Sequence, residues 1–256
     1  MLSINNNKVS GSLSALLPFM LLAFLPLKVS AQVGEYRTDL AIGVNGGYLM
    51  NKIAFVPEVP QLWAGGMTAG ITVRYTCEKY FAAICAIQAE INYANMGWKE
   101  DIDPELSSDT YYRDMRYIQL PIFARLSWGR ERKGFLFGFL IGPQLGYCFS
   151  ETEHYSDPWA GTPRPNNVTQ QYGKTVERRF EYGISGGLSF EIGTKHAGRF
   201  MLEGYYFYGL SDIFNNSKKD PFGRSANGAI IVKAAYLYDI IRTKDIVEKP
   251  RKRKRK

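Results

Sequence analysis

The segment Arg116–Ser150 most constrains what this chain of 256 residues can fold into. It consists of two runs of alternating residues around a short charged turn that Gly129 and Gly134 bound. A period of two is typical of β-strands, and two such runs joined by a tight turn predict an antiparallel hairpin. The large apolar residues on one side are Ile118, Leu120, Ile122, Ala124, Leu126 and Trp128 in the first run and Phe135, Phe137, Phe139, Ile141, Leu145, Tyr147 and Phe149 in the second.

The other side of the same hairpin carries small and polar residues. The residues on this side are Gln119, Arg125 and Ser127, with the aromatic Tyr117 and Phe123, in the first run and Gly138, Gly142, Gln144, Gly146 and Ser150 in the second. This arrangement is the reverse of a packed sandwich core. Apolar residues facing lipid and polar residues facing a lumen are typical of a membrane barrel.

The N-terminal segment sets the compartment. Lys8 precedes an apolar run from Leu13 to Leu27, and Val29-Ser30-Ala31 has the small residues of a cleavage site. The run is too short to span a membrane and contains two prolines, so we interpret residues 1–31 as a secretory signal peptide. Beyond it no apolar run approaches the roughly 20 residues of a transmembrane helix. The exported chain is therefore either a soluble β-protein or a membrane barrel.

Six further alternating runs flank the hairpin. They cover residues 40–50, 68–76, 81–93, 179–191, 200–210 and 230–240. Together with the hairpin they predict an all-β, antiparallel, up-and-down transmembrane β-barrel of about eight strands, an even number within the range of small outer-membrane barrels.

The connections between these runs alternate in length. Those near Glu78, Arg130 and Lys195 are short, whereas those near the four prolines 57, 104, 163 and 221 are long. Two of the long connections are expected to be the loops Trp98–Asp114 and Glu151–Val176. Outer-membrane barrels have short periplasmic turns and longer outer loops, whereas a soluble sandwich has no reason to sort them. The pattern predicts a bacterial outer-membrane protein with both chain ends in the periplasm.

Aromatic residues towards the strand ends fit the girdles that form at headgroup depth, although β-propensity alone also favours them. The candidates are Tyr75, Tyr80, Tyr93, Trp98, Tyr117, Trp128, Tyr147, Tyr182, Tyr206 and Tyr238.

The formal charge of +8 is concentrated at the chain ends. Residues 241–256 contain nine Lys and Arg residues against Asp245 and Glu248, and the body between the ends is close to neutral. A basic nucleic-acid-binding domain is therefore excluded. The domains are a signal peptide (1–31), a barrel (32–240) and a basic periplasmic tail (241–256). The tail is either a solvated end or an element that docks on an anionic partner through Arg251, Lys252, Arg253, Lys254, Arg255 and Lys256.

Charged residues recur on the side expected to face the lumen. They are Arg74, Glu90, Arg125, Arg179, Glu181, Glu191, Glu203 and Lys233. A barrel of about eight strands is only just wide enough for its own side chains. Because an unpaired buried charge is unfavourable, we expect a plugged interior in which these charges pair, with Arg125 near Glu90 or Glu203. The alternative is a narrow ion path.

No residues indicate an enzyme, a metal site or a cofactor. His154 lies in a long loop beside Glu151, Glu153, Ser150, Ser156 and Asp157, residue types that any polar loop offers, and His196 lies in a short turn. Two distant histidines argue against zinc, and the acidic residues 100–109 lack the calcium-loop spacing. The cysteines, Cys77, Cys85 and Cys148, are odd in number. With a turn at Glu78 and Lys79, the first two would not lie opposite each other, so no disulfide is expected.

Several segments resemble the PorT-type family of Gram-negative outer-membrane β-barrels. They are Tyr117-Ile118-Gln119-Leu120-Pro121, Ile141-Gly142-Pro143-Gln144-Leu145-Gly146-Tyr147, Tyr182-Gly183-Ile184-Ser185-Gly186-Gly187, Tyr208-Gly209-Leu210 and Tyr236-Leu237-Tyr238-Asp239-Ile240. The resemblance implies a barrel in outer-membrane lipid, and the family's named member is similar to an accessory factor of type IX secretion. It implies no catalytic residues. The basic tail after the last strand departs from the common pattern, in which the last strand ends the chain.

The expected function is therefore non-enzymatic support of protein secretion or envelope assembly, with secretion components of the periplasm or outer membrane as partners. The alternatives are a small pore and a barrel whose outer loops bind surfaces.

Overall fold

The computed structural model describes residues 35–130, 134–161, 164, 168–194 and 198–242. The expected signal peptide at residues 1–31, His196 and the tail residues 251–256 lie outside this described part. Within it, no helix is long and apolar enough to cross a membrane.

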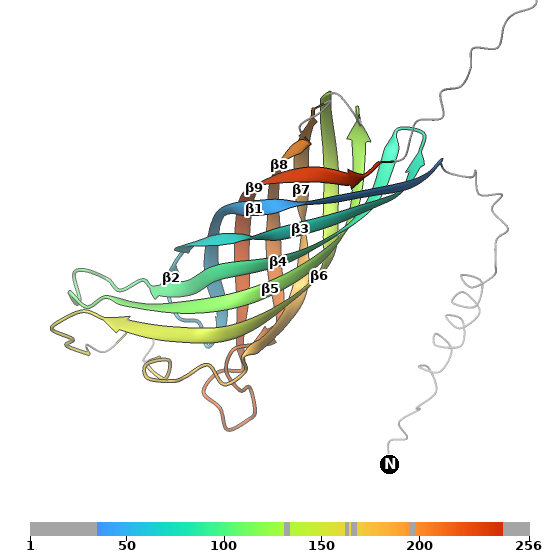
Figure 1. Ribbon diagram of the computed structural model, residues 1–256. Helices are drawn as coiled ribbons and strands as arrows, with labels where there is room; N and C mark the ends of the chain where they lie inside the picture. The colour runs from blue at the N-terminus through green and yellow to red at the C-terminus, as the bar shows by residue number, and fades with distance from the viewer. Residues whose placement is uncertain (1–34, 131–133, 162–163, 165–167, 195–197, 243–256) are drawn as a thin grey trace, which may run out of the picture. The chain divides into compact units, whose positions relative to one another are not determined.

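Eight long antiparallel strands and one short strand make up a single sheet that closes on itself (Figure 1). Each long strand pairs with its neighbours in chain order, β1 pairs with β9, and β4 pairs with β5, so the ring has no free edge among the long strands. The strands are β1 (Glu35–Val56), β2 (Gln61–Leu62), β3 (Ala64–Tyr80), β4 (Ala83–Glu100), β5 (Tyr111–Gly129), β6 (Gly134–Tyr155), β7 (Phe180–Gly193), β8 (Arg199–Asp212) and β9 (Arg224–Ile241). The predicted up-and-down barrel of about eight strands is confirmed, and β2 adds only a two-residue extension beside β4.

The hairpin of β5 and β6 has the two faces that its alternation predicts. Ile118 and Ile141 point outward and are 51% and 61% exposed, whereas Gln119 and Arg125 point inward and are at most 4% exposed. Gly129 and Gly134 both have positive φ angles, 133° and 128°, which side chains rarely tolerate, so the charged turn needs glycine at each end.

The two ends of the barrel differ in their connections. At the short-turn end lie the connections 81–82, 130–133 and 194–198; at the long-loop end lie 57–63, 101–110, 156–179 and 213–223. This alternation is the one that the sequence predicts.

Two expected loops are partly strands. β4 continues to Glu100, β5 begins at Tyr111 and β6 continues to Tyr155, so Trp98–Asp114 and Glu151–Val176 are not loops over their whole length. Their alternating inward residues, including Tyr111 and Arg113, pack inside the ring and extend its wall towards the long-loop end.

The first short turn is also displaced from its expected position. It lies at residues 81–82 rather than at Glu78 and Lys79, and a register shift after Thr76 places Cys85 opposite Glu78. Cys85 is therefore next to the position opposite Cys77, contrary to the expectation that these residues lie well apart. The thiols of both residues and of Cys148 are free.

Most of the expected girdle residues point outward. Two do not: Trp98 and Tyr117 are 0% and 1% exposed, because they lie on the inward side of β4 and β5. The outward set consists of Tyr75, Tyr80, Tyr93, Trp128, Tyr147, Tyr182, Tyr206 and Tyr238.

A charge on the outward face should oppose insertion into lipid. Ile141 lies midway along the apolar side of β6, so Ile141→Lys should destabilise the barrel by about 2–4 kcal/mol, whereas Ile141→Leu should leave its stability nearly unchanged. Urea unfolding of the purified protein in lipid vesicles measures both. Equal stability of the two variants would show that this face does not contact lipid.

Candidate functional site

The interior of the barrel gathers most of the charged residues that the alternation assigns to the lumen. Seven of them are at most 4% exposed, and they come from six different strands. They are Arg74, Glu90, Arg125, Glu181, Glu191, Glu203 and Lys233. Arg179, also expected in the lumen, is instead exposed and precedes β7.

Six of these side chains form ion pairs across the lumen. Arg74 Nη1 on β3 lies 2.6 Å from Glu191 Oε2 on β7, the strand on the opposite side of the ring. Lys233 on β9 contacts Glu90 on β4 and lies 3.2 Å from Glu203 Oε2.

Arg125 on β5 pairs with Glu203, one of its two expected partners, and donates to the side chains of Gln88 and Ser189 at 2.8 Å each. Glu203 therefore receives both Arg125 and Lys233. The register explains part of this arrangement, because Glu203 lies directly opposite Lys233 in the ladder between β8 and β9.

The charge cluster continues to the short-turn end through residues that are not among the predicted lumen charges. Arg199 lies 3.3 Å from Glu191 Oε1 and 3.0 Å from Asp239 Oδ1, and Arg242 lies 2.5 Å from Asp239 Oδ2. Alternation could have identified Arg199 and Asp239. Arg199 lies an even number of residues from Glu203 on β8, and Asp239 lies an even number of residues from Lys233 on β9, so each shares the inward face of its strand. Arg199 stands beside a predicted turn, where alternation is harder to recognise.

Glu181 is buried but stands apart from these ion pairs. Among the described residues no cation lies within salt-bridge distance of it, and Asn227 Nδ2 donates to its Oε1 at 2.5 Å. The seven residues therefore form one network of six and a separate carboxyl group.

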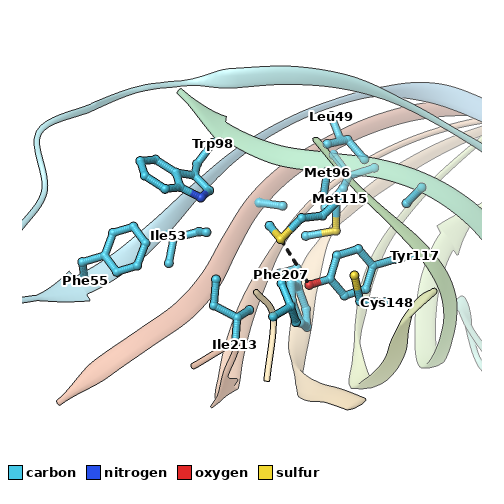
Figure 2. Close-up of a cluster of buried hydrophobic side chains, with 14 of the residues drawn as sticks. Leu49, Ile53, Phe55, Met96, Trp98, Met115, Tyr117, Cys148, Phe207 and Ile213 are labelled. Atoms are coloured by element: carbon cyan, nitrogen blue, oxygen red, sulfur yellow. Dashed lines mark hydrogen bonds between the residues drawn. The ribbon is translucent and has the colours of Figure 1, made fainter. Parts of the chain in front are cut away.

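The half of the interior towards the long-loop end contains a large cluster of buried apolar side chains, with buried polar residues such as Asn51 and Asn227 beside them. Figure 2 shows side chains from several strands converging there, among them Leu49, Met96, Met115 and Phe207. Trp98 lies at the centre of the aromatic part, with its ring centroid 5.2 Å from that of Phe55 and 5.0 Å from that of Tyr111.

The connection 213–223 also contributes to this apolar cluster. Phe214 and Phe222 are both fully buried, and the Phe222 ring centroid is 5.0 Å from that of Phe55. Side chains from this connection thus pack inside the long-loop end, whereas ion pairs occupy the opposite half.

Two buried arginines attach the connection 156–179 to the strand ends. Arg113 on β5 contacts Glu153, lies 3.3 Å from Glu151 Oε2, and donates to the carbonyl oxygen of Lys174 at 2.6 Å. Its guanidinium is also 5.7 Å from the Phe214 ring centroid.

Arg164 is the second of these arginines. It lies within the connection, 3.3 Å from Glu100 Oε1 and 3.4 Å from Asp109 Oδ2. Burial raises the pKa of the Glu100 carboxyl, although Tyr172 donates to it at 2.5 Å and Arg164 opposes the shift. Burial and the hydrogen bond to Glu100 likewise raise the pKa of Tyr172.

The residues that the sequence places around His154 do not gather there. Glu151 and Glu153 contact Arg113, and the Ser156 hydroxyl accepts a hydrogen bond from the Thr110 amide. His154 Nε2 instead lies 3.5 Å from Asp114 Oδ2, and its ring stacks on Tyr112. In the part of the chain that the structure describes, no three His, Cys, Asp or Glu side chains are grouped so as to hold a metal ion.

A closed antiparallel ring with an apolar outer face and buried ion pairs in its interior defines a small outer-membrane β-barrel protein. Residues 30–215 match the family model described as outer membrane protein beta-barrel domain. The chain belongs to this family.

Solved structures of other barrels are similar to this chain at low identity. The attachment invasion locus protein Ail of Yersinia pestis is 12% identical, with 80% of this chain and 99% of that chain covered and a TM-score of 0.34. The outer membrane protein OprG of Pseudomonas aeruginosa is 11% identical, with 80% and 98% covered and a TM-score of 0.38. The search of curated proteins found no significant match.

Removal of one cation from the network should destabilise the barrel. Arg125→Leu leaves the buried Glu203 carboxylate with one cation instead of two and should lower the free energy of unfolding by about 3–5 kcal/mol. Ile122→Leu, an outward change on the same strand, is the control and should change it by less than about 1.5 kcal/mol. Urea unfolding in vesicles measures both variants, and equal midpoints would mean that the ion pair does not contribute to stability.

Proposed function

We propose that this protein is a closed, non-conducting and non-enzymatic outer-membrane barrel that supports protein secretion or envelope assembly by contacting other envelope components. The observation that carries the proposal is the filled interior. Ion pairs occupy one half of it and apolar side chains occupy the other, so the barrel offers its ends and its outer wall for function.

The secretion role is supported by the segments that resemble the PorT-type family, such as Tyr117–Pro121 and Ile141–Tyr147. In this proposal the long-loop end faces the cell exterior and both chain ends face the periplasm. The basic tail Arg251–Lys256, which lies outside the described residues, is then a docking element for an anionic periplasmic or outer-membrane partner.

A surface-binding barrel is the second candidate. The observation in its favour is that Arg113 and Arg164, both buried, hold the connection 156–179 against the strand ends. A connection held in this way presents a fixed surface, and loops positioned on a rigid scaffold are common binding sites. The pore alternative has no comparable support, because the ion-pair network lies across the lumen.

The purified protein in a planar lipid bilayer should give no steady ionic current. The physical reason is that an ion would have to displace both paired charges and closely packed apolar side chains. A porin reconstituted in the same way is the positive control. A reproducible open-channel current at moderate voltage would contradict the closed barrel.

Deletion of Arg251–Lys256 should reduce protein secretion in the native host without reducing insertion of the barrel. The reason is loss of an electrostatic contact, so a variant with the six residues replaced by Ser and Asn should behave like the deletion. Secretion is measured by cargo in the medium, and insertion by the heat-dependent shift of the barrel on gels. Unchanged secretion with the tail removed would contradict docking and favour the surface-binding candidate.

A further inference from the structure

A groove of about 260 Å³ lies on the outer wall at the long-loop end, where β1, β8 and β9 run side by side. Its floor is made of small residues. Ala54 lies opposite Ala226 in the ladder between β1 and β9, and Lys52 lies opposite Gly228. The wall is therefore thin at these positions, whereas neighbouring outward positions carry large side chains.

The Tyr206 side chain lies close over Gly228 in the floor. A Cβ atom built there would lie 2.7 Å from the hydroxyl oxygen of Tyr206, whose ring forms one side of the groove. Trp63 and Tyr208 line the groove as well and are 46% and 44% exposed. Three amphipathic rings around a recess are what the headgroup region of a membrane favours.

Two cations stand among these rings. Lys52 Nζ lies 5.1 Å from the Trp63 ring centroid, and the Arg224 guanidinium lies 5.3 Å from the Tyr208 ring centroid. Arg224 Nη2 also donates to the Tyr208 hydroxyl at 2.5 Å. Contacts with aromatic faces orient the two cations without neutralising them.

Neither cation forms an ion pair with a carboxylate in the described part of the chain, unlike the cations of the lumen network. Asp212 is the acidic residue that acts on Arg224 electrostatically. Its carboxylate oxygens already accept hydrogen bonds, from the Ser225 amide at 2.6 Å and from Asn216 Nδ2 at 2.8 Å. The groove therefore combines an apolar surface with positive charge that is available to an external anion.

We propose that this groove binds the phosphorylated headgroup of an outer-leaflet glycolipid, with Lys52 and Arg224 contacting a phosphate. Arginine and lysine are the usual phosphate ligands of proteins. Towards the short-turn end the same wall presents Tyr48, Met50 and Val232, an apolar surface along which an acyl chain can lie. The choice of the outer leaflet rests on the orientation proposed above.

The test is binding of diphosphorylated lipid A to the full-length protein in detergent micelles, measured by native mass spectrometry. Lys52→Ala/Arg224→Ala should weaken binding at least about tenfold, because two charge-assisted contacts are lost. Ala54→Phe keeps both cations, fills the exposed floor and should weaken binding similarly. Lys99→Ala/Arg116→Ala removes the same charge from exposed positions on β4 and β5, away from the groove, and should bind like the unchanged protein.

Equal binding by the two double variants would overturn the proposal, as would equal binding of phosphatidylglycerol, which would indicate unspecific attraction of anionic lipid. Full competition by inorganic phosphate would show that the site takes a free anion rather than a lipid. The micelle assay does not depend on orientation, which an epitope inserted after Lys218 tests separately. Antibody access to this epitope in intact cells supports the outer leaflet, and access only after lysis overturns it without affecting the binding result.

Discussion

Closure of an eight-stranded ring is the constraint on which the rest of this structure depends. In lipid no water is available to hydrogen-bond the backbone of a strand, so every long strand must pair with two neighbours. Pairing of β4 with β5 and of β1 with β9 closes the ring. A ring of this size encloses a space that only its own side chains can fill. Both the outer apolar face and the dense interior follow from that geometry.

The interior is filled by two kinds of side chain, which occupy different halves of the barrel along its axis. Towards the short-turn end, ion pairs such as Arg74 with Glu191 neutralise charges that would be unfavourable alone. Towards the long-loop end, Trp98, Phe207 and the rings of the connection 213–223 pack against one another. Beyond this cluster, Arg113 and Arg164 hold the connection 156–179 against the strand ends.

Alternation predicted the hairpin of β5 and β6, the inward position of Arg125 and the barrel itself, because a period of two fixes the face of each residue. It failed at Trp98–Asp114, where the outward residues Tyr112 and Asp114 are amphipathic or charged and the contrast between faces is weak. It also assigned Arg179 to the lumen, since alternation cannot tell where a strand begins. The partners of the buried charges were only partly predictable. Lys233 on β9 and Glu90 on β4 meet across the lumen, and the alternation within each strand does not show which residues face each other across the ring.

Three ion pairs of the lumen join strands that are not neighbours in the ring. Arg74 on β3 reaches β7, Arg125 on β5 reaches β8, and Lys233 on β9 reaches β4. These three pairs cannot form within a single hairpin, although Lys233 also pairs with Glu203 on the adjacent strand β8. Complete neutralisation of the lumen charges therefore depends on closure of the ring, and a partly assembled barrel leaves some buried charges unpaired. These pairs therefore favour cooperative assembly of the barrel. Because they join residues far apart in the sequence, they form late in assembly.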